Sequence, residues 1–464
     1  MSERFTRDYT PSWSDDVVPP LPDLPRFPAG FGWGAATAAF QIEGSPTADG
    51  KGASIWDEFV ARPGAIRDGS TADVACDSYR RFREDTDLLA WLGMRDYRFS
   101  IAWPRIQPDG VGPALAAGLD HYDAVVDDLL AAGVRPVPTL YHWDLPLALQ
   151  QRGGWTNPEI VERFAEYTGL VVQRLADRVP TWITINEPVM TTLQGYGTGE
   201  LAPGLQLMQN AVPTAHLQLL AHATAAQVIK SIRSDARVGV SNNHALVVAA
   251  SDDEADVIAA DTFDRLYNRV FSDPLLLGEY PDLGPLGGRP DVPAEHLAAI
   301  AGSCDFYGLN FYNAIRIGAA DPRHTGLPFE MLDFADVPVT GFGWPIRPDD
   351  FREVLVDMHR RYGRALPPIT ITENGCSFPD GQGDSKLVDL DRVNYLHGHL
   401  TAVAAAIEQG VNVTGYYVWS LLDNFEWADG YTQRFGLTHV DFDNGTRTPR
   451  LSAHWLRDQL TAQR

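Results

Sequence analysis

Eight short apolar segments recur along the chain, and stretches with a helical pattern of apolar residues separate them. Most of the segments are rich in aromatic or β-branched residues, which is typical of buried strands. They are Trp33–Phe40, Tyr97–Ile101, Arg135–Tyr141, Thr181–Ile185, Val238–Asn242, Phe306–Asn310, Ile369–Thr372 and Tyr416–Trp419. Strands that alternate with helices predict a parallel sheet covered by helices.

The stretches between these segments have the apolar spacing of amphipathic helices. Asp120–Ala132 places its apolar residues on one face and is followed by Gly133, a suitable C-cap. Glu159–Leu175 and Ala215–Ile232 show similar periodicity. Eight strands separated by helices predict a single α/β domain with a (β/α)8 TIM-barrel fold rather than a doubly wound sheet.

The domain organisation is simple. Residues 1–28 carry six prolines among charged residues, which predicts an extended Pro-rich N-terminal arm. Residues 29–464 contain no linker, low-complexity tract or internal repeat, so we expect one barrel domain.

The charge balance restricts the partners. Lys and Arg total 37 against 61 Asp and Glu, a formal net charge of −24. Nucleic acids and anionic membranes need a basic surface, so neither is an expected partner. A small neutral ligand fits this balance best. The composition does not indicate an oligomeric state.

The predicted location is the cytoplasm. The N-terminal residues lack the pattern of a secretory signal, and no run of about 18 apolar residues predicts a membrane span. Cys76, Cys304 and Cys376 are odd in number and lack CxxC spacing, which favours reduced and mostly buried thiols.

Polar residues end the predicted strands, at the positions where barrel proteins place their active sites. Glu187, in Thr-Ile-Asn-Glu-Pro, ends the fourth strand, and Glu373, in Ile-Thr-Glu-Asn-Gly, ends the seventh. We expect the two to face each other across the mouth of the barrel. Cleavage of a glycosidic bond needs one protonated and one ionised carboxyl group on either side of the bond. Each Glu could instead pair with an Arg or cap a helix.

Eight ordered blocks then make the chain recognisable. They are FGWGAATAAFQIEG, GASIWDEF, YRFSIAWPRI, LYHWDLP, WITINEP, YGLNFYN, ITENG and VWSLLDNFEWADGY. From about Phe31 to Trp455 the chain closely resembles the family-one glycoside hydrolases, of which β-glucosidases are the best known. The resemblance implies a retaining β-glycosidase with Glu187 as acid/base and Glu373 as nucleophile. Plant thioglucosidases of this family carry Gln at the acid/base position, so Glu187 favours ordinary O-glycosides.

The resemblance also implies roles for the neighbouring residues. Arg98, Tyr312 and Asn310 would support the two carboxyl groups, with Arg98 and Tyr312 beside Glu373. Asn186 would bond the sugar 2-hydroxyl, and Trp419 would stack under the sugar ring. The remaining residues expected to bind substrate are Gln41, His142, Glu426, Trp427 and Phe435.

The substrate is expected to be a neutral β-glucoside or short oligosaccharide. Relatives that act on 6-phosphosugars carry a Ser, a Lys and a Tyr after the strand-eight Trp, where this chain has Glu426-Trp427 and Gln433-Arg434-Phe435. Glu426 would repel a phosphate, although Arg434 leaves a basic group nearby. Gln41 and Glu426 can bond either orientation at C4, so galactosyl and fucosyl substrates stay open beside glucosyl.

The predicted mechanism is double displacement, with carboxyl groups about 5 Å apart and no cofactor or metal. A transglycosidase with alcohol acceptors, a 6-phospho-β-glycosidase and a non-catalytic sugar-binding barrel are the alternatives. The leaving-group side is expected in loops Gly195–Leu207 and Ala320–Phe342, which do not identify the aglycone. Trp143, Trp344 and Tyr417 are interpreted as packing or rim residues, and His397 and His399 as surface residues.

Overall fold

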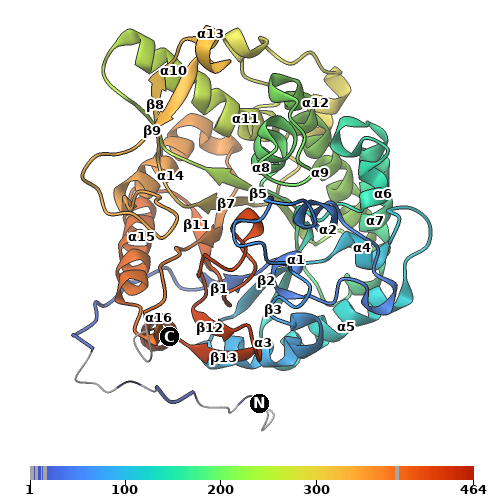
Figure 1. The fold of residues 1–464 in the computed structure, drawn as a ribbon, viewed down its shortest axis with the longest axis vertical. Coiled ribbons are helices and arrows are strands. Elements are labelled where there is room, and N and C mark those ends of the chain that lie inside the picture. The colour runs from blue at the N-terminus through green and yellow to red at the C-terminus, as the bar shows by residue number, and fades with distance from the viewer. Residues whose placement is uncertain (1–4, 6–8, 12, 14–17, 382–385, 464) are drawn as a thin grey trace.

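Eight parallel strands close into a barrel in the order β1-β11-β10-β7-β5-β4-β3-β2 in the computed structural model (Figure 1). The strands are β1 (Gly32–Ala36), β2 (Asp96–Ser100), β3 (Arg135–Tyr141), β4 (Thr181–Asn186), β5 (Arg237–His244), β7 (Tyr307–Phe311), β10 (Ile369–Asn374) and β11 (Val413–Trp419). The structure describes residues 5, 9–11, 13, 18–381 and 386–463. The predicted (β/α)8 barrel is therefore confirmed.

Each predicted segment coincides with one barrel strand, but the first needs correction. Trp33–Phe40 was predicted as a strand throughout, whereas β1 ends at Ala36 and helix α1 spans Ala39–Ile42. The backbone N–H of Thr37 donates to the carbonyl of Arg98 (2.9 Å) and that of Ala39 to Ser100 Oγ (2.7 Å). These contacts with β2 turn the chain, and they are not visible in the local sequence.

Helices follow or precede the barrel strands around the ring. The longer ones are α3 (Ser78–Leu92), α5 (Ala116–Ala131), α7 (Glu159–Leu175), α9 (Val212–Ile232), α10 (Glu254–Asp264), α14 (Pro348–Tyr362), α15 (Leu390–Glu408) and α16 (Leu451–Ala462). The shorter α-helices are α2 (Ile55–Val60), α4 (Trp103–Ile106), α6 (Leu147–Gln150), α8 (Pro188–Met190), α11 (Val270–Leu276), α12 (Ala294–Ile300) and α13 (Pro322–Thr325). No helix within the described ranges combines the length and apolar character that crossing a membrane requires.

Short 3₁₀ and π segments complete the helical elements. They are η3 (Ala48–Gly50), η4 (Gly154–Thr156), η5 (Thr191–Thr198), η6 (Met208–Ala211), η7 (Arg265–Arg269), η8 (Gly284–Leu286), η9 (Gly363–Ala365) and η11 (Trp427–Asp429). The predicted loop Gly195–Leu207 is thus helical at its start, because η5 extends to Thr198.

Helix α7 shows why the periodic stretches fold as predicted. Ile160, Phe164, Val171 and Leu175 recur at intervals of four or seven residues, and all four are buried. This spacing places them on one face, which packs inward while charged residues face solvent. The observed bounds of α7 are those predicted.

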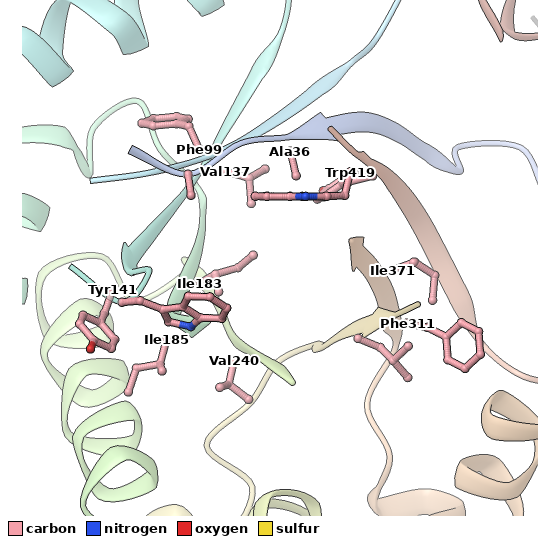
Figure 2. Close-up of a cluster of buried hydrophobic side chains, with 14 of the residues drawn as sticks. Ala36, Phe99, Val137, Tyr141, Ile183, Ile185, Val240, Phe311, Ile371 and Trp419 are labelled. Atoms are coloured by element: carbon pink, nitrogen blue, oxygen red, sulfur yellow. The ribbon is translucent and has the colours of Figure 1, made fainter. Parts of the chain in front are cut away.

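The core is continuous from the barrel strands to the surrounding helices. Figure 2 shows one cluster of these side chains, in which Ala36, Val137, Ile183, Ile371 and Trp419 come from β1, β3, β4, β10 and β11. Trp419 is buried at the last position of β11. The core therefore reaches up to the ends of the strands, where the site lies.

Two small sheets lie outside the barrel. One contains β6 (Val247–Ala249), β8 (Ile315–Ala319) and β9 (Phe329–Leu332), and the other contains β12 (Thr438–Asp441) and β13 (Thr446–Pro449). They lie at opposite ends of the view in Figure 1, with α10 and α13 beside the first and α16 beside the second. The predicted loop Ala320–Phe342 is therefore partly a strand.

The N-terminal arm meets the C-terminal helix. Trp455 Nε1 donates to the carbonyl of Pro22 (2.8 Å), and the N–H of Leu24 donates to Gln459 Oε1 (2.8 Å). Residues 18–28 contain neither a helix nor a strand. Residues 1–4, 6–8, 12 and 14–17 of the predicted arm lie outside the described residues.

Candidate functional site

The carboxyl ends of the barrel strands open into one cavity of about 1030 Å³. Nine of the residues predicted for the site border it: His142, Asn186, Glu187, Tyr312, Glu373, Trp419, Glu426, Trp427 and Phe435. The other three, Gln41, Arg98 and Asn310, are fully buried and bond to residues that border it. The fold thus brings all twelve predicted residues to one place.

Backbone irregularities aim the two glutamates. The register shifts between Ile183 and Asn186 in β4 and between Ile371 and Glu373 in β10. Such bulges rotate the side chains that follow them. Glu187 itself has a φ of 43°, in the left-handed region that non-glycine residues rarely adopt, immediately before Pro188 begins α8. Local strain of this kind is concentrated at functional sites.

Gly375 follows the Glu-Asn pair for a steric reason. A Cβ at this position would lie 1.6 Å from the carbonyl oxygen of Trp419. The chain after Glu373 therefore passes directly against the end of β11, and only glycine permits this approach. The Ile-Thr-Glu-Asn-Gly sequence thus couples the positions of Glu373 and Trp419.

Glu373 has partners that stabilise its ionised form. Arg98 Nη1 donates to Oε1 (2.5 Å), and the Tyr312 hydroxyl donates to Oε2 (2.6 Å). Burial raises the pKa of Glu373, while the charge of Arg98 and the bonds from Tyr312 and Arg98 oppose that rise. Both predicted neighbours of Glu373 are in place.

Glu187 has a different environment. Asn310 Nδ2 donates to its Oε1 over 2.7 Å. Burial, and then the negative charge of Glu373, raise the pKa of Glu187 to about 8. The pair titrates as a unit. A single proton on the pair resides on Glu187, because Glu373 has Arg98 and Tyr312 to stabilise its charge.

Asn186 joins the two halves of the site. Its Oδ1 accepts from Arg98 Nη2 (2.5 Å) and from Asn310 Nδ2 (3.2 Å). Its amide nitrogen must then be the donor to His142 Nε2, which lies 3.0 Å away. Burial lowers the pKa of His142 well below its ordinary value, so the ring is neutral. The ring proton therefore sits on Nδ1, which is buried and has no partner.

Gln41 and Glu426 form a second polar group. Gln41 Nε2 donates to Glu426 Oε2 (3.1 Å), while Gln41 Oε1 is buried and unpaired. Burial raises the pKa of Glu426 well above its ordinary value, and Glu373 adds to the shift. Like His142 Nδ1, these groups offer hydrogen bonds that a bound hydroxyl-rich ligand can complete.

Aromatic rings border the polar groups. His142 stacks with Trp419 (centroids 5.8 Å apart) and with Trp427 (5.9 Å). The ring centroids of Trp143 and Trp427 lie 4.6 Å apart, and Trp143 Nε1 donates to the carbonyl of Asn186 (3.0 Å). Trp143 and Trp344 both border the cavity, in agreement with their interpretation as rim or packing residues.

Some polar residues near the strand ends belong to the framework instead. Glu43, which follows helix α1, accepts hydrogen bonds from Arg105 Nε (2.6 Å) and from the Tyr122 hydroxyl (2.7 Å). His399 was predicted at the surface but is fully buried, which corrects that interpretation. The ring centroids of His399 and Tyr395 lie 3.8 Å apart, and His399 Nδ1 lies 2.8 Å from the Tyr395 carbonyl oxygen. His399 is buried because it lies on the face of α15 that packs inward.

Among the described residues, one group of side chains lies close enough together to hold a cation. It consists of Asp380, Asp423 and His439. Arg450 Nη2 already contacts Asp380 (2.6 Å) and Asp423 (2.8 Å), and Arg434 Nη1 lies 3.3 Å from Asp423. The two guanidinium groups thus supply the countercharge. The cluster is a partly buried ion-pair network around Asp423, which precedes Glu426 on the same segment.

Several cavity residues were missed by sequence reasoning. Leu266 and Tyr267 of η7 and Phe329 and Met331 of β9 border the cavity. The predicted leaving-group loop Ala320–Phe342 includes Phe329 and Met331 but was not assigned any ligand chemistry. The apolar residues that recur in this predicted loop, among them Phe329 and Met331, are the sequence signal that could have identified this part of the cavity.

Comparisons with known proteins identify the family to which the chain belongs. Residues 24–464 match the model of glycosyl hydrolase family 1. The chain is 40% identical to beta-glucosidase A of Thermotoga maritima, over 93% of this chain and 97% of that protein. It is also 40% identical to the 1,4-beta-D-glucan glucohydrolase of Thermotoga neapolitana, over 94% of this chain and 98% of that protein. The structure of the Thermotoga maritima β-glucosidase in complex with isofagomine lactam superposes with a TM-score of 0.89 at 39% identity, covering 94% and 99% of the two chains.

The fold and the paired carboxyl groups at the mouth of the barrel define a glycoside hydrolase of the (β/α)8 class. The match over nearly the whole length makes the assignment specific: the chain belongs to glycosyl hydrolase family 1.

Proposed function

We propose that this protein is a retaining β-glucosidase that releases terminal non-reducing β-D-glucosyl residues from neutral β-glucosides. Glu373 is the nucleophile and Glu187 the acid/base. The observation that carries the proposal is the unequal environment of the two carboxyl groups. Arg98 and Tyr312 stabilise a charge on Glu373, whereas burial and the charge of Glu373 keep a proton on Glu187.

In the first step Glu373 attacks the anomeric carbon and forms a covalent glycosyl-enzyme. Glu187 transfers its proton to the glycosidic oxygen, and the bond from that oxygen to the anomeric carbon breaks. Asn310 occupies Oε1 of Glu187, which leaves Oε2 to hold the proton. Attack consumes the charge on Glu373, so the interaction that raises the pKa of Glu187 weakens as the reaction proceeds.

In the second step water hydrolyses the glycosyl-enzyme. Glu187 is now ionised and accepts a proton from the water, which attacks the anomeric carbon and releases Glu373. Two displacements at one carbon give net retention of the β configuration. Arg98 and Tyr312 then stabilise the carboxylate that departs.

The unpaired polar groups of the site match the hydroxyls of a glucosyl ring. His142 Nδ1–H can donate, while Gln41 Oε1 and the carboxyl group of Glu426 can accept. Trp419 presents an aromatic face, which suits the apolar face of a sugar. Because Gln41 and Glu426 can bond an equatorial or an axial hydroxyl, galactosyl and fucosyl substrates fit the same proposal.

A phosphorylated sugar fits the site less well. Arg434, the basic residue noted in the sequence, does not border the cavity. Its side chain contacts Asp423 and donates to the carbonyl of Val440 (3.0 Å). Among the described residues that border the cavity, Arg316 is the one Lys or Arg side chain, and it bonds to backbone carbonyls. A phosphate bound beside Glu426 would therefore lack a cationic partner.

The proposal includes a cytoplasmic location and a small carbohydrate as partner, with neither nucleic acid nor membrane. Its support is the three free cysteines and the net charge of −24.

The test is hydrolysis of a chromogenic aryl β-glucoside by Glu373→Gln. We expect kcat to fall by at least about 10⁴-fold with an unchanged circular dichroism spectrum. Glu200→Gln, which alters another carboxyl group at the cavity wall, is the matched control and should keep wild-type activity. Proton NMR of the wild-type reaction should show the β-anomer of glucose first. Near-normal activity of Glu373→Gln, or α-glucose as first product, would contradict the assignment.

A further inference from the structure

Two hydroxyl groups lie behind Asn310, the residue that donates a hydrogen bond to Glu187. Asn310 Nδ2 contacts Glu187 Oε1 over 2.7 Å. At the other end of the amide, Asn310 Oδ1 accepts from Ser241 Oγ (2.8 Å) and from Thr372 Oγ1 (2.7 Å). We call the side chains of Ser241 and Thr372 the hydroxyl pair.

The hydroxyl pair comes from the two strands that flank the strand of Asn310. Ser241 is on β5, Asn310 on β7 and Thr372 on β10, and these strands are neighbours in the barrel. The two hydroxyl oxygens lie 2.7 Å apart. A Cβ on Gly308 of β7 would lie 3.0 Å from Ser241 Cα and 3.1 Å from Thr372 Cγ2. The missing side chain of Gly308 therefore leaves room for the hydroxyl pair to meet.

The hydroxyl pair does not touch the space that a substrate fills. Ser241, Thr372 and Asn310 are fully buried, and none of these three residues borders the cavity. The backbone N–H of Glu187 donates to the carbonyl of Ser241 (2.7 Å), and Arg98 Nη1 donates to the carbonyl of Thr372 (3.0 Å). These backbone contacts do not involve the hydroxyls, so the hydroxyls can be removed separately.

The orientation of the Asn310 amide decides what it offers to Glu187. Asn186 Oδ1 accepts from Arg98 Nη2 (2.5 Å), and Asn310 faces this same oxygen with Nδ2 (3.2 Å). With the amide reversed, its oxygen would lie against the oxygens of Asn186 and Glu187. The hydroxyl pair favours the observed orientation, because it supplies donors to an amide oxygen that would otherwise be buried and unpaired.

Given the proposed function, on which this inference rests, we propose that Ser241 and Thr372 are positioning residues that hold the Asn310 amide so that it donates to the acid/base. Burial and the charge of Glu373 raise the pKa of Glu187, and the bond from Asn310 opposes that rise. The bond therefore helps Glu187 to release its proton in the first step and to stay ionised until water attacks in the second.

The test is the pH dependence of kcat/KM for an aryl β-glucoside in the double variant Ser241→Ala with Thr372→Val. The two changes remove the hydroxyls and nearly conserve the volume of the side chains. Weakening the bond to Glu187 should move the basic limb of the profile to higher pH by about one unit. The acidic limb should move less, because Glu373 keeps its bonds from its own partners.

Conservative and single variants are the controls. Thr372→Ser keeps the hydroxyl and should keep the basic limb at the wild-type pH. Thr370→Val makes the same change on the same strand, where the hydroxyl contacts Thr414 Oγ1 (3.4 Å), and should also leave the limb in place. Ser241→Ala or Thr372→Val alone should move the limb by about 0.3 unit, because the other hydroxyl still donates. These single variants provide the test if the double variant does not fold.

Asn310→Ala shows whether the hydroxyl pair acts through Asn310. This variant removes the amide and should move the basic limb to higher pH by about one unit or more. Adding Ser241→Ala and Thr372→Val to Asn310→Ala should move the limb no further, because the hydroxyls then have no amide to orient.

The outcomes separate this inference from the proposed function. A basic limb that stays at the wild-type pH in the double and single variants would overturn the positioning role. A further shift on the Asn310→Ala background, or an equal shift in Thr370→Val, would overturn it too, since the hydroxyls would then act through general packing. A wild-type enzyme that has no basic limb, or that cleaves no β-glucoside, would overturn the proposed function itself.

Discussion

Tyr312→Phe removes one hydrogen bond to Glu373 and leaves the aromatic ring in place. The Tyr312 hydroxyl lies 2.6 Å from Oε2 of a carboxyl group that is only 3% exposed. A hydrogen bond to a charged group contributes about 1.5–3 kcal/mol. One pKa unit corresponds to about 1.4 kcal/mol. We therefore expect the pKa of Glu373 to rise by about one to two units.

The sign follows from the state that the bond favours. The hydroxyl stabilises the ionised form of Glu373, so its loss raises the pKa and lowers the ionised fraction at acidic pH. The acidic limb of the kcat/KM profile should move to higher pH by about one to two units. The assay is hydrolysis of an aryl β-glucoside between about pH 4 and pH 9.

Tyr267→Phe is the matched control for this experiment. Tyr267 also borders the cavity, but its hydroxyl bonds to Asn243 and not to Glu373. The acidic limb of the kcat/KM profile of Tyr267→Phe should stay at the wild-type pH. An unmoved limb in Tyr312→Phe would refute the reasoning even if activity fell, because Tyr312 would then act through packing alone.

Three further predictions concern the same framework. Burial and the charge of Glu373 raise the pKa of Glu187 to about 8. Since Glu187 must carry a proton to act as the acid, kcat/KM should fall about tenfold per pH unit above about pH 8. A kcat/KM that levels off beyond about pH 9 would contradict the role of Glu187. Arg450→Met leaves the buried carboxylate of Asp423 without its main partner and should lower the urea-derived free energy of unfolding by about 3–5 kcal/mol at neutral pH. Arg450 holds the pKa of Asp423 below its ordinary 3.8. The difference in unfolding free energy between the wild type and Arg450→Met should therefore narrow below about pH 4, as Asp423 is protonated. A difference in unfolding free energy that does not change with pH would argue against the ion pair. Gly375→Ala places a methyl group 1.6 Å from the Trp419 carbonyl and should cost more than about 3 kcal/mol, whereas a wild-type melting temperature would show that the loop can move aside.

The strands and the two catalytic candidates were accessible from the chain because they depend on local patterns. Arg135–Tyr141 and Thr181–Asn186 are short, mostly apolar and buried after their first residue, so their composition reports their structure directly. Glu187 and Glu373 end such strands, and in a parallel barrel all strand ends meet at one mouth. Local pattern and topology were therefore enough to predict that these residues meet.

The errors arose where contacts distant in the sequence decide the structure. Phe40 lies in a helix because Thr37 and Ala39 bond to β2, more than 60 residues away in the chain. His399 is buried by the packing of α15, although its neighbours in the sequence include polar residues. Neither contact has a signature in the adjacent sequence.

The sequence by itself determined the barrel, the pair of glutamates and the family, since each rests on residue types at fixed places along the chain. Only the tertiary structure decided how the proton is shared, where the proton of His142 lies, and what surrounds the leaving group. Those properties depend on distances between residues of different strands, such as Arg98 to Glu373 and Asn186 to His142. Burial and hydrogen bonding act through space, and the order of residues does not encode them directly.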